Sequence, residues 1–356
     1  MTTLAIVDPI EDPAWDAFVA GHPWGQVYHL SGWKRALEAS FRHMKGYYLV
    51  LREGAGGKIL AGIPAFKVSS WLTGKRLVSL PFATLSDPLV SDAGQAGFLL
   101  DGILRLSASL RCSRVEIRTL LAHAYMTDPR FDQSNVYVHH YLDLGRDLDS
   151  LRSGFHRTCV RQRIAKAERS GIELEWADGE SALKDFYRLL IRTRRKNALP
   201  VQPYSFIKSL WDAFRPGGRL AILLARKDGP AVAGLLLLKH RNRVSAEFAV
   251  SDESFNPLSP VHLAFWHAIR AAREEGYEIF DFGRTSPRNQ SLMEFKGRWG
   301  TQAVPLRHFF HPAGTARDAG EKEGTWGYRM TRAALSAGRS DLVHRAISAF
   351  CYRHLG

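Results

Sequence analysis

Cysteine is scarce in this sequence, and its scarcity excludes several classes of protein. Only three cysteines occur among 356 residues, Cys112, Cys159 and Cys351, and they lie far apart. An odd number at these spacings builds neither a disulfide framework nor a zinc-binding motif, and it is typical of a reducing compartment. The 14 histidines are equally scattered. We therefore expect no metal site.

Long hydrophobic runs are absent as well. No segment approaches the roughly 18 consecutive apolar residues that a membrane-spanning helix needs. The segment Met1–Trp15 is acidic and lacks the basic-then-apolar pattern of a signal peptide. Together with the cysteine content, these features predict a cytoplasmic protein.

Familiar catalytic motifs are also missing. The sequence contains no Gly-rich Walker loop, dinucleotide-binding fingerprint, HExxH motif or nucleophile elbow. No cysteine or serine stands in the setting of an activated nucleophile, so a covalent acyl-enzyme is not expected. For an acyl transfer, direct attack by a bound amine fits the sequence better.

Positive charge, in contrast, is plentiful. Lys and Arg number 49 against 35 Asp and Glu, which gives a formal net charge of +14. A strongly basic protein attracts nucleic acid, anionic membrane or phosphorylated substrates. The hydrophobic content of 45% is that of a globular protein, and the length suffices for two domains.

The predicted helices and strands follow a similar plan in both halves of the chain. Strands at 47–52 and 58–68 form a hairpin whose second strand contains Ala61-Gly62. A hairpin in the second half contains Ala233-Gly234 at the equivalent place. Glycine within a strand often marks a close approach of another backbone or side chain. The repetition indicates a duplicated domain.

The segment Tyr277–Gly300 carries the strongest functional signal. It opens as a short buried strand, turns at a glycine, runs through a polar loop and closes on FKGRWG. Asp281 and Arg284 lie where the strand ends, and Lys296 and Arg298 lie in the closing sequence. Charged residues at the end of a buried strand often belong to a functional site. A salt-bridged turn is the alternative.

This segment, with the preceding helix that ends in Glu-Glu-Gly-Tyr, resembles the C-terminal half of FemAB-type proteins. The matching elements are DFGR, the polar loop and FKxxWG. FemAB-type proteins are tandem GNAT-fold acyltransferases, and the best-known members add amino acids to the peptide of peptidoglycan precursors of the cell wall. The resemblance covers residues 13–310. The sequence resembles a bacterial branch associated with exosortase, PEP-CTERM and exopolysaccharide loci more closely than it resembles the wall-bridge enzymes themselves.

The resemblance implies an α/β fold of two tandem GNAT-like domains with mixed central sheets. The first domain would comprise residues 1–148, and the second, with the catalytic cleft, residues 149–311. Residues 312–356 would form a linker and an amphipathic C-terminal helix. The implied activity is transfer of an acyl or aminoacyl group to an amine of a phosphate-bearing cell-envelope or exopolysaccharide precursor.

The resemblance also implies substrate-binding residues. Arg195, at the end of a predicted helix, best matches an arginine that contacts the substrate in FemAB-type proteins, and Arg194 lies beside it. With Arg284, Arg195 would hold phosphate or carboxylate groups. Arg298 and Lys34 are further candidates. For Lys34, a solvated helix lysine is the favoured interpretation over a substrate contact.

Three residues are candidates for catalysis. Lys296 would stabilise the charge that develops on the acyl carbonyl oxygen, and Asp281 would orient Arg284. Glu247 lies in the middle of a predicted strand at 243–250, where a buried carboxylate is costly unless it is paired or functional. Because GNAT enzymes often place a base on the equivalent strand, Glu247 would take the proton of the attacking amine.

The acyl donor stays open. GNAT acetyltransferases cradle the pyrophosphate of coenzyme A on backbone amides at a helix N-terminus, but the corresponding segment, 254–262, has two prolines and no glycine. We expect no tightly bound cofactor, and either aminoacyl-tRNA or acyl-CoA as donor. The absence of the helical arm found in some wall-bridge relatives argues against aminoacyl-tRNA. DNA is not an expected partner.

Two alternatives of function also stay open. One is a non-catalytic component of an exopolysaccharide or protein-sorting system that binds an anionic glycolipid. The other is an ordinary acyl-CoA-dependent GNAT N-acetyltransferase.

Two basic segments bear on the choice of partner. Residues 151–170 are predicted to form one helix with a polar face of five cations, which fits either phosphate binding or a solvated surface. In the C-terminal helix, Leu342, Ala346 and Phe350 belong to an apolar stripe flanked by basic residues. This helix would pack on its own domain or lie peripherally on anionic membrane at its inner face.

Overall fold

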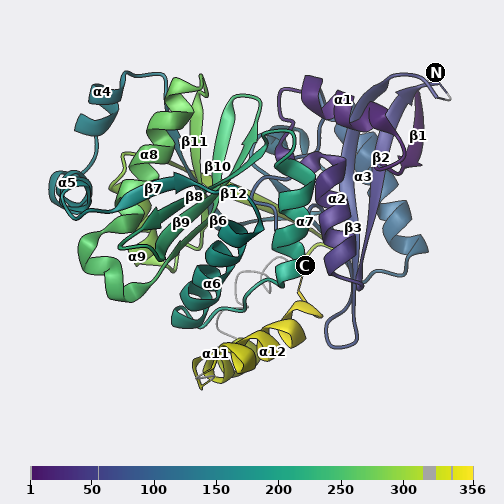
Figure 1. Cartoon of the computed structure of the whole chain (residues 1–356). Helices are drawn as coiled ribbons and strands as arrows, with labels where there is room; N and C mark the ends of the chain where they lie inside the picture. The colour runs from purple at the N-terminus through teal and green to yellow at the C-terminus, as the bar shows by residue number, and fades with distance from the viewer. Residues whose placement is uncertain (1, 55, 316–325, 338–339, 356) are drawn as a thin grey trace. The chain divides into compact units, whose positions relative to one another are not determined.

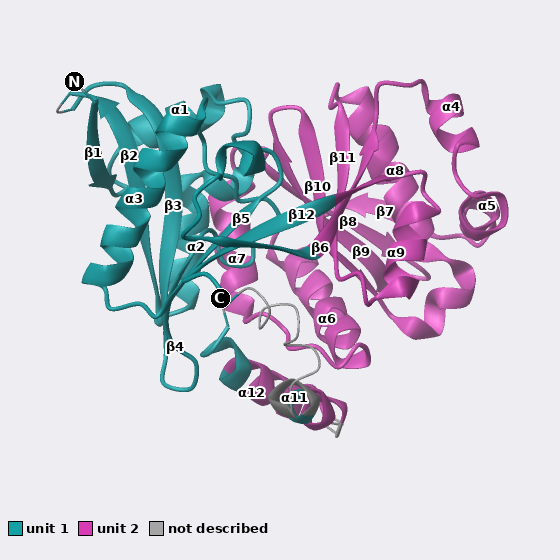
Figure 2. Cartoon of the chain, turned by 180° about the vertical axis from the view of Figure 1, so that it is seen from behind, with its two compact units in different colours: residues 1–136, 305–331, 350–356 teal, residues 137–304, 332–349 magenta. Residues whose placement is uncertain are grey.

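A computed structural model describes residues 2–54, 56–315, 326–337 and 340–355. The chain forms two compact units, which Figure 2 shows in different colours. Unit 1 comprises residues 1–136, 305–331 and 350–356, and unit 2 comprises residues 137–304 and 332–349. Each unit therefore takes segments from distant parts of the sequence.

Unit 1 is built on strands in the order β1-β2-β3-β4-β5-β12. All neighbouring strands in it are antiparallel except β4 and β5. The strands are β1 (Thr2–Val7), β2 (Met44–Glu53), β3 (Ile59–Ser70), β4 (Gly74–Val78), β5 (Arg114–Thr119) and β12 (Gln302–His311). The α-helices are α1 (Pro13–Gly21), α2 (Ser31–Ser40) and α3 (Ala93–Ser109).

Both faces of the unit 1 sheet are covered, because side chains alternate along β2. Leu49 and Leu51 join the core cluster that includes α3. Tyr48, which points to the other face, meets the ring of Trp15 from α1 at 5.0 Å. Neighbouring strand residues that are both buried require cover on both faces of a sheet.

Unit 2 repeats this plan with strands in the order β6-β11-β10-β9-β8-β7. Again one pair alone is parallel, β10 with β11. The strands are β6 (Asp132–Asp143), β7 (Glu173–Trp176), β8 (Leu220–Arg226), β9 (Ala231–His240), β10 (Arg243–Ser251) and β11 (Ile279–Thr285). The α-helices are α4 (Leu148–Ser153), α5 (Gln162–Glu168), α6 (Glu180–Lys196), α7 (Tyr204–Phe214), α8 (Pro260–Glu274) and α9 (Gln290–Gly297), seen in Figure 1.

Each unit is completed by a strand from the other half of the sequence. Strand β12 follows β11 in the chain but pairs with β5, whereas β6 follows β5 but pairs with β11. The predicted limits at residues 148/149 and 311/312 assign β6 to the first half and β12 to the second. As limits of the duplicated sequence segments, these boundaries stay a prediction. The compact units differ from the segments because each unit contains one strand from the other half of the sequence.

The two predicted Ala-Gly pairs lie at equivalent places in the two sheets. A Cβ atom on Gly62 of β3 would lie 2.5 Å from the ring of Trp15, and one on Gly234 of β9 would lie 3.0 Å from the carbonyl oxygen of Leu223. A helix packs closely on each glycine. Trp15 of α1 covers Gly62 in unit 1, and Phe186 of α6 covers Gly234 in unit 2. Glycine is therefore required in both hairpins for close packing.

The predicted basic helix at 151–170 is interrupted. Helix α4 ends at Ser153, a π-helical turn spans Arg157–Arg161, and α5 starts at Gln162. The break falls at His156, whose amide donates to the carbonyl oxygen of Arg298 and whose ring accepts from the Cys159 amide. The single-helix prediction is wrong because these contacts take the backbone out of the helix.

The C-terminal segment contains α11 (Trp326–Ala337) and α12 (Asp341–Tyr352). Most of the predicted linker, residues 316–325, lies outside the described residues. Among the helices that the structure describes, none has the length and apolar character to cross a membrane.

Candidate active site

Strands β10 and β11 part where the predicted site begins. Their parallel pairing joins Arg243 to Ile279, Val244 to Phe280 and Ser245 to Asp281. Farther on, β10 continues against β9 and β11 continues against β6. Both strands have a register shift just beyond the last pair, around Glu247 in β10 and between Asp281 and Gly283 in β11. Such bulges bend strands and re-aim side chains beside functional sites.

Asp281 is fully buried at the point where the strands part. Its Oδ2 accepts a hydrogen bond from Arg243 Nη1 at 3.0 Å and lies 3.5 Å from His139 Nε2. Its Oδ1 accepts from the Gly283 amide at 2.6 Å, and Gly283 has a φ of 72°, which favours glycine. Asp281 therefore fixes the bulge of β11 after which Arg284 follows.

Helix α9 returns Lys296 to the same turn. Lys296 is 6% exposed, and its Nζ donates to the carbonyl oxygens of Gly283 at 3.0 Å and Arg284 at 3.1 Å. Burial lowers the pKa of Lys296 to about 8; Asp281 opposes this shift and Arg284 adds to it. An ammonium has three N–H donors, so two of them hold this turn and a third can act elsewhere.

Arg284 is half-buried, and its guanidinium lies over the ring of Tyr137, with Cζ 4.7 Å from the ring centroid. Stacking on an aromatic face fixes the plane of a guanidinium. An arginine held in this way can bind a phosphate or carboxylate through two parallel hydrogen bonds. The structure thus brings together three predicted site residues: Asp281, Arg284 and Lys296.

His140 contributes an uncharged wall to this cluster. Its side chain is buried, and its Nε2 lies 3.2 Å from the sulfur of Met293 in α9. Burial, reinforced by the charge of Lys296, lowers the pKa of His140 to about 4. The ring is therefore neutral near pH 7.

Glu247 and Arg194 lie beside the bulge of β10. Glu247 is half-buried, two residues after Ser245, the strand partner of Asp281. The guanidinium of Arg194 lies over the neighbouring Phe248 ring, 5.7 Å from its centroid. Glu247 therefore belongs to the segment of β10 that no longer pairs with β11, and Arg194 reaches this segment from α6.

Three other predicted residues do not join the cluster in the described contacts. Arg195 pairs with Asp341 of α12. Arg298 pairs with Glu294 at 2.8 Å on the exposed face of α9. In unit 1, Lys34 is 1% exposed and pairs with Asp8 at 3.0 Å and Glu38 at 3.1 Å. Lys34 is therefore a buried, paired lysine, and the solvated-lysine interpretation is wrong.

Sequence analysis did not identify Arg243 and His139 as site residues. Both are buried and both face Asp281 from neighbouring strands. A signal was present for Arg243, since a cation at the start of a buried strand needs an anionic partner. The identity of that partner depends on strand pairing, which the sequence does not state.

The N-terminus of α8 does not provide a cradle of amides for a pyrophosphate group. Pro260, its first residue, has no amide hydrogen. The amides of His262 and Leu263 donate to the carbonyl oxygen of Ser259 at 3.1 and 3.5 Å. That coenzyme A is not held here in the manner of a GNAT acetyltransferase stays a prediction.

No group of three or more His, Cys, Asp or Glu side chains in the described parts of the chain is placed to hold a metal ion. The cluster at the end of β11 offers one carboxylate, cations and the neutral imidazole of His140. Its chemistry is that of binding anions and stabilising negative charge.

One family model matches part of the chain. Residues 154–296 match the family model of the acetyltransferase (GNAT) domain. The matched range contains the parallel strand pair and ends at Lys296. No curated protein sequence matches the chain.

Solved structures extend the similarity to nearly the whole chain. The structure of FemX is similar with a TM-score of 0.69 at 15% identity, over 86% of this chain and 96% of that one. A C-terminal (DUF2156) domain assigned to a lysylphosphatidylglycerol synthetase of Agrobacterium fabrum is similar with a TM-score of 0.58 at 14% identity. The match covers 92% of this chain and 97% of that one. A tandem GNAT protein from the clavulanic acid biosynthesis pathway is similar with a TM-score of 0.57 at 12% identity. The match covers 88% of this chain and 99% of that one.

The chain is a tandem GNAT-fold protein, and its fold is that of FemX. The predicted fold class is confirmed, as is the FemAB-like resemblance at the level of fold. A GNAT domain together with these neighbours also supports the predicted acyltransferase class. The association with exosortase, PEP-CTERM and exopolysaccharide loci stays a prediction.

Proposed function

We propose that unit 2 transfers an acyl or aminoacyl group to an amine of a phosphate-bearing cell-envelope or exopolysaccharide precursor. The observation that carries this proposal is the convergence of Asp281, Arg284 and Lys296 where β10 and β11 part. Arg284, oriented by Tyr137, would hold a phosphate or carboxylate of the acceptor.

The reaction would proceed by direct attack. The amine nitrogen adds to the acyl carbonyl carbon, and the tetrahedral intermediate collapses with loss of the donor's leaving group. The negative charge on the carbonyl oxygen would be met by Lys296, whose position is fixed by its two hydrogen bonds to the carbonyl oxygens of Gly283 and Arg284. Glu247 would accept the proton that the amine loses.

Lys296 would have a second role as a positioning residue. Because it binds the carbonyl oxygen of Arg284, its removal would also loosen the backbone that presents the guanidinium. Loss of turnover with unchanged substrate affinity would favour the electrostatic role, and loss of both would favour positioning.

The missing amide cradle at α8 favours a donor other than acyl-CoA. An aminoacyl donor such as aminoacyl-tRNA would agree with the likeness to a domain of a lysylphosphatidylglycerol synthetase. That protein's name describes a lysyl group on a phospholipid, and an acceptor with a phosphate and a lipid chain would suit a basic protein here as well. We accordingly propose that the chain works in peripheral contact with an anionic membrane.

A non-catalytic protein that binds an anionic glycolipid is the second candidate. It is favoured by the two hydrogen bonds that engage Lys296 with the backbone. The two candidates differ in one requirement: a transferase needs Lys296 and Glu247 for turnover, whereas a binder needs only cations such as Arg284.

A thermal-shift screen tests the proposal. The panel contains acetyl-CoA, longer acyl-CoAs, aminoacyl-tRNA mimics and UDP-linked cell-wall precursors, each at two salt concentrations. We expect stabilisation by the phosphate-bearing precursors, retained in Arg298→Ala and lost in Arg284→Gln. Stabilisation by acyl-CoA alone would contradict the choice of donor and indicate an ordinary GNAT N-acetyltransferase.

A further inference from the structure

Helix α12 packs with its polar side inward. His344 and Ser348 are buried, and the Ser348 hydroxyl accepts a hydrogen bond from the Val201 amide at 3.0 Å. The large apolar side chains of the helix are exposed instead: Leu342 at 76%, Val343 at 49% and Phe350 at 52%. An amphipathic helix in this orientation leaves its apolar stripe for something other than its own domain.

The turn between β3 and β4 in unit 1 exposes a second apolar pair. Trp71 is 79% exposed and Leu72 is 61% exposed. The ring of His354 makes edge contacts with both Trp71, at 5.2 Å, and Phe350, at 5.1 Å. Trp71 and Phe350 therefore lie against one histidine, and we call these two residues, with Leu72 next to Trp71 in the chain, the apolar patch.

The charge around the apolar patch has one sign. Segments 71–78 and 350–355 of unit 1, which contain the patch, have no aspartate or glutamate. Lys75 and Arg353 are exposed, and neither forms an ion pair with a carboxylate in the described residues. Many other cations of the chain, such as Arg298, have a carboxylate partner. The surroundings of the patch thus call for an anionic partner.

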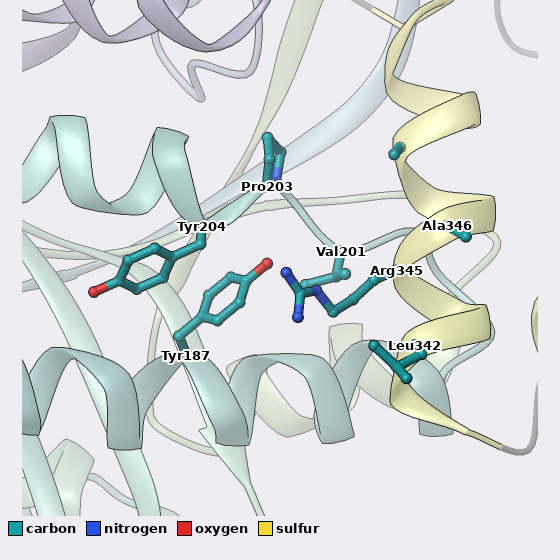
Figure 3. Close-up of a pocket in the computed structure, with 8 residues that line it drawn as sticks. Tyr187, Val201, Pro203, Tyr204, Leu342, Arg345 and Ala346 are labelled. Carbon is teal, nitrogen blue, oxygen red and sulfur yellow. The ribbon is translucent and has the colours of Figure 1, made fainter.

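A cavity of about 340 Å³ lies beside α12 within unit 2. Figure 3 shows Arg345 and Leu342 on α12 facing Tyr187, with Tyr204 beside it. The Tyr187 hydroxyl donates to the carbonyl oxygen of Gln202 at 2.9 Å, so Arg345 is the charged group that the cavity offers. An apolar cavity with one guanidinium suits an anionic head group next to an acyl chain.

We infer that the β3–β4 turn and the end of the chain from Phe350 onward, both in unit 1, form a docking surface for an anionic phospholipid bilayer. Trp71, Leu72 and Phe350 enter the interface, as exposed aromatic and aliphatic residues of peripheral proteins do. Lys75 and Arg353 contact lipid phosphates, and each such cation adds attraction to an anionic leaflet. A second copy of the chain would bring cations against cations, so charge complementarity favours the lipid.

The test is sedimentation of the full chain with vesicles of phosphatidylcholine, with and without phosphatidylglycerol, at low and high salt. Variants Trp71→Ser/Phe350→Ser and Lys75→Glu/Arg353→Glu are compared with the wild type. The matched controls lie on α3: Phe98→Ser, at a position 64% exposed, and Arg105→Glu, also exposed. All these positions are on the surface, so the thermal midpoints should agree with that of the wild type.

We expect the wild type to bind the phosphatidylglycerol vesicles and to be released by salt. Each double variant should lower the partition coefficient by about tenfold or more, while both controls bind as the wild type does. Absence of binding to anionic vesicles, or an equal loss in the controls, would overturn the inference. So would a wild type that is a dimer in solution and becomes monomeric in Trp71→Ser/Phe350→Ser.

This surface deepens the proposed peripheral membrane contact, but it is tested without turnover. Failure of vesicle binding would leave the ligand shifts of the site at β11 unaffected. Conversely, loss of those shifts in Arg284→Gln would leave vesicle binding unchanged.

Discussion

Unit 1 and unit 2 place the same kinds of residue at the same point of their sheets. Glu116 on β5 and Asp281 on β11 hold the third position in the parallel pairing with β4 and β10. Each carboxylate is followed by an arginine, Arg118 or Arg284. Each arginine stands opposite a histidine on the antiparallel neighbouring strand, His308 or His139 respectively. The duplication therefore extends from the fold to individual polar residues.

The two clusters differ in what the arginine does. In unit 1, Arg118 Nε donates to Glu116 Oε1 at 2.8 Å, and His308 lies 3.4 Å from the same oxygen. Burial tends to raise the pKa of Glu116, but Arg118 and His308 hold it well below its usual value. Arg118 is 6% exposed, so this cluster is closed upon itself.

In unit 2, the carboxylate takes its arginine from the neighbouring strand. Asp281 binds Arg243, while Arg284 stacks on Tyr137 at a half-buried position and Lys296 holds its backbone. A bulge between Asp281 and Gly283, which has no counterpart in the β5 pairing, accompanies this change. The comparison teaches that one copy of the cluster is a structural ion pair and that the other presents its arginine.

The largest effect on stability is expected when the buried carboxylate of either unit, Glu116 or Asp281, is removed. Glu116→Ala and Asp281→Ala should each lower the free energy of unfolding by about 3–5 kcal/mol, because each leaves a buried arginine without its anion. Chemical denaturation measures this. With the milder Glu116→Gln and Asp281→Asn, only the latter should abolish ligand-induced stabilisation. Equal loss of ligand response in both variants would contradict the division of roles.

Lys296 has no counterpart among the described contacts of the unit 1 cluster. The loss of its proton with rising pH should therefore be measurable as a change in the stability of the protein. Burial lowers the pKa of Lys296 from 10.5 to about 8. Between these pH values the unfolded chain binds more protons, so stability rises with pH as the cost of burying the charge disappears. Relative to Lys296→Met, the wild type should gain up to about 3 kcal/mol from pH 8 to pH 10.5. Parallel stability curves for the two proteins would argue against a buried charged lysine.

The hairpin glycines offer a smaller test of the duplication. Gly62→Ala should destabilise the protein by about 1–3 kcal/mol, because the new methyl group meets the ring of Trp15. Gly234→Ala should cost a similar amount, since its methyl group meets the Leu223 carbonyl. Thermal denaturation measures both. Adding Trp15→Leu should restore part of the loss in Gly62→Ala and none in Gly234→Ala; restoration of both would show a general effect of alanine.

The smallest effect is expected for Arg298→Ala. Its ion pair with Glu294 spans one turn of an exposed helix face, and such pairs contribute about 0.3–0.5 kcal/mol. Both stability and ligand response should stay close to those of the wild type. A strong loss of ligand binding would instead restore Arg298 as a substrate contact.

Local sequence was sufficient to predict which residues meet at the end of β11, while their functional roles stay predictions. Asp281, Arg284 and Lys296 lie within one strand–turn–helix segment, so their convergence depends on few long-range contacts. The Ala-Gly pairs were informative for the same reason, since each hairpin is formed by neighbouring strands.

Long-range pairing determined what the sequence did not show. The contact of Asp281 with Arg243 and His139 requires the parallel pairing of β10 with β11 and the exchange of β6. The break before α5 depends on a hydrogen bond from His156 to Arg298, far along the chain. An apolar stripe normally predicts a buried helix face, and on α12 it does not, because His344 and Ser348 occupy the inward side.

The most direct measurement is the ligand-induced thermal shift of three proteins with the same phosphate-bearing precursors: the wild type, Glu116→Gln and Arg284→Gln. We predict equal shifts for the wild type and Glu116→Gln and no shift for Arg284→Gln. A full shift in Arg284→Gln, or its loss in Glu116→Gln, would contradict the claim that unit 2 alone carries the working copy of the cluster.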